Sequence, residues 1–427
     1  MVIITFVKMT DTEMILKKII LLSLLFLLTN NIFAQQNKSK LTLSGDFRTI
    51  SEYRQGYKTL LVESSNPAFV ISQRSRLILN YKSDKFDLRF SAQDVRAWGE
   101  TFIINSSKPI LLHEAWIKYH FSPYLNLTIG RQSFKYGDKR ILSDRNWSIP
   151  GASHDAAILN FKKKSLLIDF GIAINNNSTK ILEATPYAIE QYKAMSWFWL
   201  TKTFSPKVKI NFINLLAGYQ KTGTLTTYGL NTIGLNPILK SYGFTLNSAA
   251  YFQFGKNGTG NNHFAHIYTA NLSYTYQFLS TKAGYDHYSG KKYDDTSTTD
   301  HHYLQAVETS SHTFFGFMDI IKGSQFQKQY GVTDLNFNIK YGKKTIFTAY
   351  YHALSYAQEP GAGLSKKIGD EFDFVLTHKF AANHSLDIGY SFILPHNDFI
   401  DSSLGSNTNA AFAQWAWVRL TFKPNLL

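Results

Sequence analysis

The feature that most constrains the fold is a repeated alternation of apolar and polar residues with a period of two. After residue 40 we find no sustained helical period, and segments of about ten residues alternate in this way instead. A transmembrane β-strand has this length and pattern, because one face meets lipid and the other faces an aqueous interior. The eighteen segments are 41–49, 72–82, 86–96, 112–121, 125–133, 156–163, 166–175, 195–204, 208–218, 227–235, 242–254, 264–278, 281–288, 331–341, 345–356, 370–380, 385–394 and 412–422.

The connections between these segments alternate between short and long. The short ones include 83–85, 122–124, 164–165, 205–207, 342–344 and 381–384, and the long ones include 50–71, 97–111, 134–155, 176–194, 255–263, 289–330, 357–369 and 395–411. Bacterial outer-membrane barrels combine short periplasmic turns with long outer loops. A soluble sandwich has no reason to keep this alternation. We therefore predict an all-β fold: a single closed antiparallel transmembrane β-barrel of about 18 strands, with both ends of the barrel chain on the periplasmic side.

Side-chain parity within the segments supports a closed barrel. In the segment 86–96, Phe86, Leu88 and Phe90 share one face, and Asp87 and Arg89 share the other. The last two segments divide in the same way. Backbone groups in lipid must be paired internally, so the sheet has to close on itself. Five aromatic residues near segment ends are predicted to form the interface girdles: Tyr119, Trp197, Trp199, Trp415 and Trp417.

The same parity rule assigns charged residues to the interior. The basic ones are Arg48, Arg74, Arg76, Arg89, Lys118, Lys209, Lys340 and Arg419. The acidic ones are Asp46, Asp87, Glu114, Asp169, Glu371, Asp373 and Asp387. Arginine offers a planar fork that suits carboxylates, and a sugar-acid polymer carries one carboxylate per unit. The alternative is that arginine and acid pair across the barrel and hold its shape.

Composition excludes several classes of protein. The chain of 427 residues has no Cys, which excludes disulfides, thiolate metal sites and Cys nucleophiles. Mean hydropathy is slightly negative, which argues against a helical membrane protein. The formal charge of +15 predicts either general surface charge or attraction of polyanions. Nucleic acid is not an expected partner, because the sequence has no basic arm or recognised nucleic-acid module.

The first 34 residues have the layout of a secretory signal peptide. Lys17 and Lys18 precede an apolar run over 19–28, and Ala34 offers a small residue for cleavage. Met14 is a second candidate for the start of this peptide, and the alternative to a signal peptide is a membrane anchor. We expect residues 1–34 to be a signal peptide and residues 35–427 to form one barrel domain in the outer membrane of a Gram-negative cell.

A long connection follows Ile129 and is rich in charge, glycine and aromatic residues. Its length indicates a functional loop, and its aromatic content argues against disorder. Gly137 permits a tight turn. Asp138 and Arg140 can pair and fix the loop, or Arg140 can point into the channel. Arg131 has the outward parity of Ile129, which predicts a place at the membrane interface unless a bulge intervenes.

This connection also carries a recognisable motif. Gly-Arg-Gln at 130–132 is followed by Tyr-Gly-Asp-Lys-Arg-Ile at 136–141, then by Trp147, Gly151 and Asp155. Later come His-Thr-Phe-Phe-Gly-Phe-Met-Asp at 312–319, Gly-Asp-Glu-Phe-Asp at 369–373 and Trp-Ala-Trp-Val-Arg-Leu-Thr-Phe at 415–422. In this order the motifs resemble the alginate-export family of outer-membrane β-barrels.

The resemblance implies a passive channel for an anionic, alginate-like polysaccharide or its oligomers. It also implies that Arg131, Asp138 and Arg140 are structural or constriction residues. The candidate residues that line the channel and contact substrate are Arg74, Arg76, Arg89, Lys118, Arg140, Lys340 and Arg419. The candidate loop-structuring residues are Arg131, Gly137, Asp138, Trp147 and Asp155.

Two other functions stay open on the sequence. One is a general porin for small solutes, which the mixed interior charge favours. The other is an enzyme on a barrel, which needs a Ser–His pair with an orienting partner. No such constellation stands out, so we predict no catalytic residues and no cofactor. Expected partners are outer-membrane lipid and an anionic polysaccharide or oligosaccharide, with periplasmic export or uptake partners as an open addition.

A group of acids and histidines lies in the connection 289–330. It consists of Asp294, Asp295, Asp300, His301 and His302. The spacing matches no metal motif, and oxygen-rich outer loops bind Ca²⁺ weakly. We expect an exposed polar loop here and no metal site.

Overall fold

A computed structural model describes residues 39–100, 110–175, 192–221, 223–297, 300–307, 309, 311–321 and 330–427. The predicted signal peptide (1–34) and the alternative start at Met14 lie outside the described residues. The barrel strands in the first half are β1 (Lys40–Gln55), β2 (Ala68–Lys82), β3 (Phe86–Ala97), β4 (Leu111–His120), β5 (Leu125–Gln132), β6 (His154–Lys163), β7 (Leu166–Ile174), β8 (Ala194–Ser205) and β9 (Val208–Gln220). Those in the second half are β10 (Thr227–Ser241), β11 (Phe244–Lys256), β12 (Asn262–Tyr276), β13 (Leu279–Tyr288), β15 (Val332–Gly342), β16 (Thr345–Ser355), β17 (Lys367–Ala381), β18 (His384–Pro395) and β19 (Ala413–Phe422).

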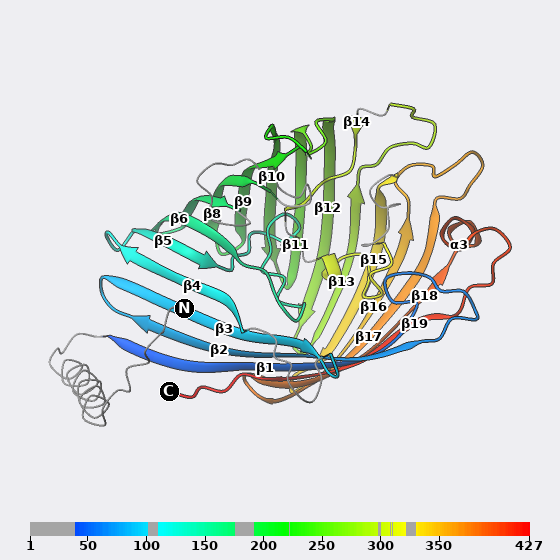
Figure 1. Cartoon of the computed structure of the whole chain (residues 1–427). Helices are drawn as coiled ribbons and strands as arrows, with labels where there is room; N and C mark the ends of the chain where they lie inside the picture. Colours follow the sequence, from blue (N-terminus) through cyan, green and yellow to red (C-terminus); the bar gives the residue numbers. More distant parts are fainter. Residues whose placement is uncertain are drawn as a thin grey trace, which may run out of the picture.

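These strands form a closed antiparallel barrel (Figure 1). Each strand pairs with its neighbours along the chain, and β1 pairs with β19, with Phe47 opposite Phe422. The sheet has 19 strands because the two-residue strand β14 (Asp300–His301) adds to β12 in parallel. The predicted barrel of eighteen strands is confirmed, and the predicted segments fall on its strands in order. The segment 227–235 was predicted too short, because β10 continues through Pro237, which lies opposite Ile210.

The two ends of the barrel differ in their connections: short turns join the strands at one end, and long loops join them at the other. At the short-turn end, Tyr242 and Gly243 connect β10 to β11 with φ of 46° and 84°, the positive values that a tight two-residue hairpin turn requires. The long loops contain η1 (Ser311–Thr313) and α3 (Asn397–Leu404). Figure 1 shows α3 at the opposite end of the barrel from the C-terminus. Within the described ranges, no helix is long and apolar enough to cross a membrane.

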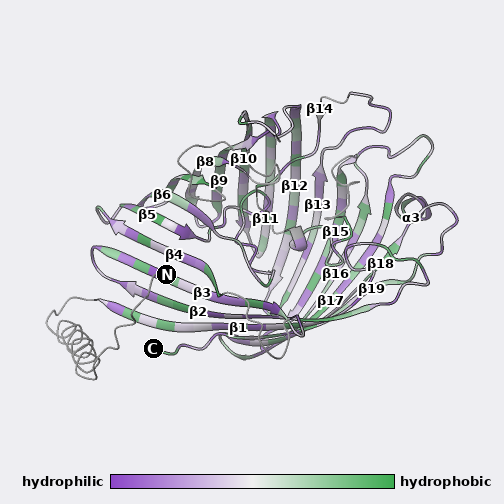
Figure 2. Ribbon diagram, in the orientation of Figure 1, coloured by the Kyte–Doolittle hydropathy of each residue, from purple (hydrophilic) through white to green (hydrophobic). Residues whose placement is uncertain are grey.

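The outer face of the barrel is apolar and its inner face is polar. Leu77, Phe90 and Phe170 are each about half exposed on the outside. Arg74 and Asp334, which have the opposite parity, are fully buried on the inside. Figure 2 shows the alternation of hydropathy along the strands. The apolar side chains of the outer face can contact the hydrocarbon of the bilayer. The polar side chains of the inner face can line a lumen that contains water or folded loops.

The girdle prediction is wrong for the tryptophans. Four of them are buried on the inner face: Trp197, Trp199, Trp415 and Trp417. Trp197 covers Gly171 and Trp417 covers Gly389, and a Cβ at either glycine would overlap the indole ring. Trp415 and Trp417 share the parity of Arg419, which the sequence had assigned to the interior. They are buried because loops fold into the lumen and cover them. Tyr119 does lie on the outer face.

Candidate functional site

The connection between β5 and β6, residues 133–153, folds into the lumen, and we call it the first inward loop. Leu142 is completely buried, and Arg140 and Ile141 beside it are nearly so. The backbone N–H of Tyr136 donates to the carbonyl of Leu142 at 3.1 Å, which closes the loop on itself. Burial also raises the pKa of the Tyr136 hydroxyl, with the nearby Asp169 adding to this effect. The loop is therefore a packed element of the interior and not an outer flap.

Gly137 is the residue that lets this loop approach the wall. Its φ is 57°, and a Cβ there would lie 3.1 Å from the ring of Trp199 on β8. Next to it, Asp138 accepts a hydrogen bond from the hydroxyl of Tyr251 on β11 at 2.8 Å. A larger residue at 137 would adopt this positive φ under strain and would crowd the ring of Trp199. The turn predicted at Gly137 is thus present, and it faces the inside of the barrel.

Arg140 anchors the loop to β13, two strands from β11. Its Nε lies 3.1 Å from Asp138 Oδ2, and its Nη2 lies 2.7 Å from Asp286 Oδ2 on β13. Its Nη1 donates to the hydroxyl of Tyr288. The guanidinium also lies 3.8 Å from the ring centre of Phe314. Of the two alternatives for Arg140, the structure shows the pair with Asp138, and the buried guanidinium is also paired with Asp286.

The far end of the first inward loop is held by arginines of β1 and β2. Arg48 donates to the carbonyl of Asn146 at 2.6 Å. Arg74 donates to the carbonyl of Ile149 at 3.1 Å, and Arg76 to that of Pro150 at 3.2 Å. Backbone carbonyls carry no net charge, so these contacts fix the loop without neutralising the guanidinium groups. The loop consequently spans the lumen from β13 to β1 and β2.

Trp147 joins the first inward loop to a second one. Its ring stacks on His312 with centroids 4.4 Å apart and meets Trp417 edge-on at 5.3 Å. The guanidinium of Arg419 lies 4.2 Å from the same ring. His312 belongs to the segment 311–321, which we call the second inward loop, and its Met318 and Ile320 are buried. The two loops and the wall of β19 therefore form one constriction.

Two buried carboxylates of β17 hold the second inward loop. The backbone N–H of Met318 donates to Glu371 Oε1 at 2.7 Å, and that of Phe317 donates to Asp373 Oδ1 at 3.3 Å. Within the same loop, Asp319 accepts from the hydroxyl of Tyr57 at 3.2 Å. Burial, with this carboxylate as a further cause, raises the pKa of Tyr57. Parity placed Glu371 and Asp373 inside but did not identify their partners, although both segments belong to the quoted motifs.

Gly316 should be the least replaceable residue of the second inward loop. Its φ is 83°, and a Cβ would overlap the carboxylate of Glu371. We expect Gly316→Ala to lower the free energy of unfolding by about 1–3 kcal/mol, because it adds a clash to an unfavourable backbone conformation. Urea unfolding of the barrel in lipid vesicles measures this loss.

Gly363 provides the matched control for this substitution. Its φ is 72°, but an added Cβ would meet nothing within 4 Å. Gly363→Ala should therefore show only the cost of the backbone conformation. Equal losses for the two variants would mean that the contact between Gly316 and Glu371 contributes nothing.

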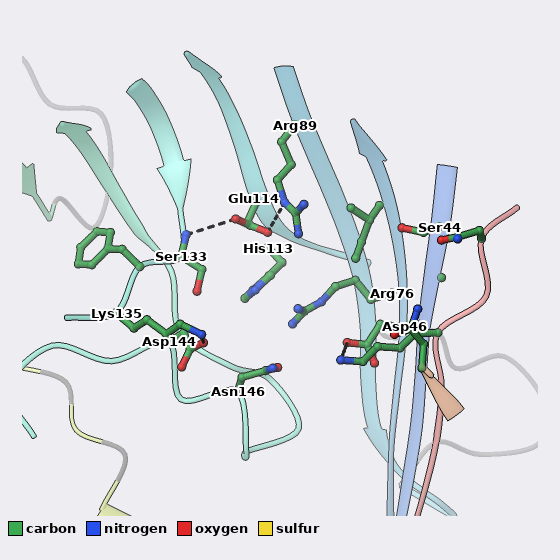
Figure 3. Close-up of a pocket in the computed structure, with 16 residues that line it drawn as sticks. Ser44, Asp46, Arg76, Arg89, His113, Glu114, Ser133, Lys135, Asp144 and Asn146 are labelled. Carbon is green, nitrogen blue, oxygen red and sulfur yellow. Dashed lines mark hydrogen bonds and ion pairs between the residues drawn. The ribbon is translucent and has the colours of Figure 1, made fainter. Parts of the chain in front are cut away.

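A cavity of about 460 Å³ lies between the first inward loop and the wall formed by β1 to β4 (Figure 3). This volume lies within the range of small-ligand sites. In Figure 3 the guanidinium of Arg76 points into the space between the wall and the loop that carries Asp144 and Asn146. The ionisable lining residues are Asp46, Arg76, Arg89, His113, Glu114, Lys135, Asp144 and Lys423.

Some of the arginines around this cavity are paired with acids. Arg74 Nη2 lies 2.7 Å from Asp46 Oδ2, and Arg89 Nε lies 2.6 Å from Glu114 Oε2. Farther along the wall, Arg419 Nε lies 3.1 Å from Asp387 Oδ2. For these residues the structure shows arginine–acid pairs between neighbouring strands, whereas the sequence alternative had such pairs across the barrel.

Arg76 and Arg48 differ from their neighbours. Arg76 donates to the side-chain oxygen of Gln93 at 2.9 and 2.6 Å, besides its contact with Pro150. Within the described part of the chain, neither Arg76 nor Arg48 forms an ion pair with a carboxylate. The positive charges of these arginines also affect Lys423, which follows directly after β19. Burial lowers the pKa of its ammonium, Asp46 opposes this, and the nearby arginines lower it further.

Other predicted site residues lie away from the constriction. Lys118 and Lys340 are on β4 and β15 toward the short-turn end, and Lys118 Nζ lies 5.6 Å from the ring centre of Trp116. Arg131 Nη1 lies 3.0 Å from Asp155 Oδ2 in an exposed pair, with the outward parity that was predicted. In the cluster considered for a cation, Asp295 lies 3.5 Å from Lys291 Nζ.

The structure defines the class of this protein: a closed outer-membrane β-barrel with an apolar belt and loops folded into its lumen. Solved structures match it over nearly its whole length. The crystal structure of Pseudomonas aeruginosa OccK5 (OpdH) has a TM-score of 0.59 at 11% identity, covering 91% of this chain and 99% of that one. Acinetobacter baumannii OccAB2 has a TM-score of 0.60 at 13% identity, covering 91% and 98%. The outer membrane protein opdK of P. aeruginosa has a TM-score of 0.61 at 10% identity, covering 90% and 99%.

At such low identity this likeness establishes the fold. No family model matches the chain, and no curated protein matches it either. The predicted outer-membrane barrel is confirmed. Membership of the alginate-export family stays a prediction that rests on the motifs.

Proposed function

We propose that this protein is a passive outer-membrane channel for anionic solutes, with an alginate-like polysaccharide or its oligomers as the preferred substrate. The single observation that carries this proposal is the positive charge of Arg48 and Arg76 at the constriction, which within the described residues form no ion pair with a carboxylate. Their hydrogen bonds go to neutral oxygens, and the nearby Asp46 is paired with Arg74. A guanidinium in this state gains from a carboxylate on a passing solute, which it can bind through two parallel hydrogen bonds.

The site geometry also supports a solute with carboxylates at intervals. Arg76 lines the cavity, together with Arg89 and Lys423, so a chain molecule would meet successive cationic groups along one wall. The paired acids Asp46 and Glu114 keep the total positive charge moderate. Moderate binding is what a channel needs, because a solute must leave as readily as it enters.

The charge of Arg48 and Arg76 is testable by reversal potentials. We expect the double variant Arg48→Gln/Arg76→Gln to lower the ratio of anion to cation permeability several-fold in planar bilayers, since two fixed positive charges leave the constriction. Uronate oligomers should block the current of the unaltered protein and block the variant more weakly.

Arg131→Gln is the matched control, because it removes one positive charge from the exposed outer pair with Asp155. It should leave selectivity unchanged. The conductance of the double variant must be measured alongside, because these arginines also hold the first inward loop. Cation preference without any block by uronate oligomers in the unaltered protein would refute the proposal.

A general porin is the second candidate, and the ion pairs of Arg74, Arg89 and Arg419 favour it. In that case the arginines mainly hold the shape of the lumen. Liposome swelling with neutral sugars of similar size separates the two functions. A general porin passes neutral and acidic sugars at rates set by size alone.

A further inference from the structure

Six lysines occupy equivalent places at the short-turn end of the barrel, and we call them the lysine ring. They come from the six strands β2, β6, β9, β10, β15 and β17, all around the wall. The members are Lys82, Lys162, Lys209, Lys240, Lys340 and Lys379. Each lies close to the end of its strand that borders a short turn. All six are exposed.

Strand parity turns these lysines toward the lumen. Lys340 has the parity of Asp334 and Asn336, both buried on the inner face of β15. Lys379 has the parity of Asp373 on β17. The pairing of β17 with β16 runs without a shift from Thr345 opposite His378 to Leu354 opposite Gly369, so the parity is preserved along this strand.

The lysine ring has few acids near it. Within the part of the chain that the structure describes, none of its six members forms an ion pair with a carboxylate. The acids nearest this end are Asp84 in the turn before β3, Asp87 on β3, Asp169 on β7 and Asp387 on β18. Asp87 lies directly opposite Lys82, and Asp387 pairs with Arg419. In the described strands the other five lysines have no acid directly opposite them, so the periplasmic mouth keeps an excess of positive charge.

The other end of the barrel is organised differently. There, some charges pair with near neighbours in the chain: Arg54 Nη2 lies 2.7 Å from Glu52 Oε2, and Lys367 Nζ lies 2.6 Å from Asp370 Oδ2. The exposed lysines of this end, such as Lys221 and Lys366, share the outer loops with acids such as Glu63, Glu359 and Asp398. Paired charges of this kind produce little field beyond a few ångströms, because each cation is cancelled by its acid. The electrostatic attraction for an anion thus differs between the two mouths.

We infer that the lysine ring captures polyanionic chains from the periplasmic side, so that the channel takes them up faster from that side than from outside. The inference rests on the proposed function, an anion-conducting channel, and adds the side of the membrane from which the anion is captured. A ring of like charges at a mouth with low-dielectric walls focuses the field and raises the rate of encounter with an oppositely charged solute. Lysine suits this role because its ammonium is a mobile point charge on a flexible stem.

Such capture acts on the rate of association. The ring lies at the mouth, away from the constriction, so it should leave the residence time of a bound chain almost unchanged. Because the pore is passive, the lysine ring cannot change the direction of net transport at equilibrium. Salt should weaken the effect strongly, because the Debye length is about 8 Å at physiological ionic strength.

The test is single-channel recording on protein inserted in one known orientation, with a galacturonate oligomer added to one side at a time. In low salt, the unaltered protein should show blocking events at least about tenfold more often from the periplasmic side. The variant K209Q/K240Q/K340Q/K379Q should lose most of this excess, with unchanged block duration and unchanged block frequency from the outer side.

The matched control removes four exposed lysines from the outer end of the barrel, as K221Q/K256Q/K292Q/K366Q. It has the same net charge as the ring variant and should keep the excess. Equal block frequencies from the two sides of the unaltered protein, or a full excess in the ring variant, would overturn the inference while leaving the proposed function in place. A complete absence of block together with cation preference would overturn both.

Discussion

Replacing residues 134–151 with Asn-Gly should raise the single-channel conductance several-fold. These residues make up most of the first inward loop, which spans the lumen and contacts β13, β1 and β2. Removing them replaces packed protein with electrolyte along the conducting path. The barrel should still fold, because Gln132 and His154 already pair across β5 and β6, and Asn-Gly favours a tight hairpin turn. Planar bilayer recording measures the change.

Shortening the loop tip at 361–364 is the control for this experiment. The tip connects β16 to β17, and its residues Ala362, Gly363 and Leu364 are exposed. Its removal alters an outer loop of the same barrel without touching the constriction, so conductance should stay the same. If the shortened first inward loop gives unaltered conductance, the constriction does not limit ion flow and the site proposed here is misplaced.

Arg140→Met should lower the free energy of unfolding by about 3–5 kcal/mol, the usual cost of removing one partner of a buried ion pair. The guanidinium is almost completely buried between Asp138 and Asp286. Methionine fills similar space but leaves two carboxylates without their cation. Urea unfolding in lipid vesicles gives the stability, and the current trace should become noisier because the loop is released from β13.

Arg131→Met is the control, because its pair with Asp155 is exposed on both sides. Exposed ion pairs contribute about 0–1 kcal/mol. The combination Arg140→Met/Asp286→Leu should recover part of the loss, because one of the stranded carboxylates is then gone. A loss for Arg140→Met as small as that for Arg131→Met would show that water reaches the cluster and that the loop is not locked by it.

The barrel itself could be predicted because its physics is local. Lipid on one side forces the period of two, and short turns mark one end of every hairpin. Pro237 did not end β10, since pairing on both sides carries the strand past it. Parity also put Arg74, Glu114 and Asp373 on the inner face, where the structure has them.

The constriction could be predicted only in part, because its contacts join distant segments. Arg140 and Asp286 lie 146 positions apart, and the sequence around either residue does not predict its contact with the other. The tryptophans show the same limit. Parity gives the face of Trp415 and Trp417, but whether a ring meets lipid, water or another loop depends on how the outer connections fold. That choice is made by the packing of Trp147 and His312 against them.

The pairing of β1 with β19 has a consequence for biogenesis. The two strands stand at opposite ends of the described chain, so no shorter fragment can seal the wall. Until the last hairpin is added, the growing sheet has two edge strands with unpaired backbone amides, and hydrocarbon cannot solvate these amides. Both edges therefore need a partner or a cover until β1 and β19 pair.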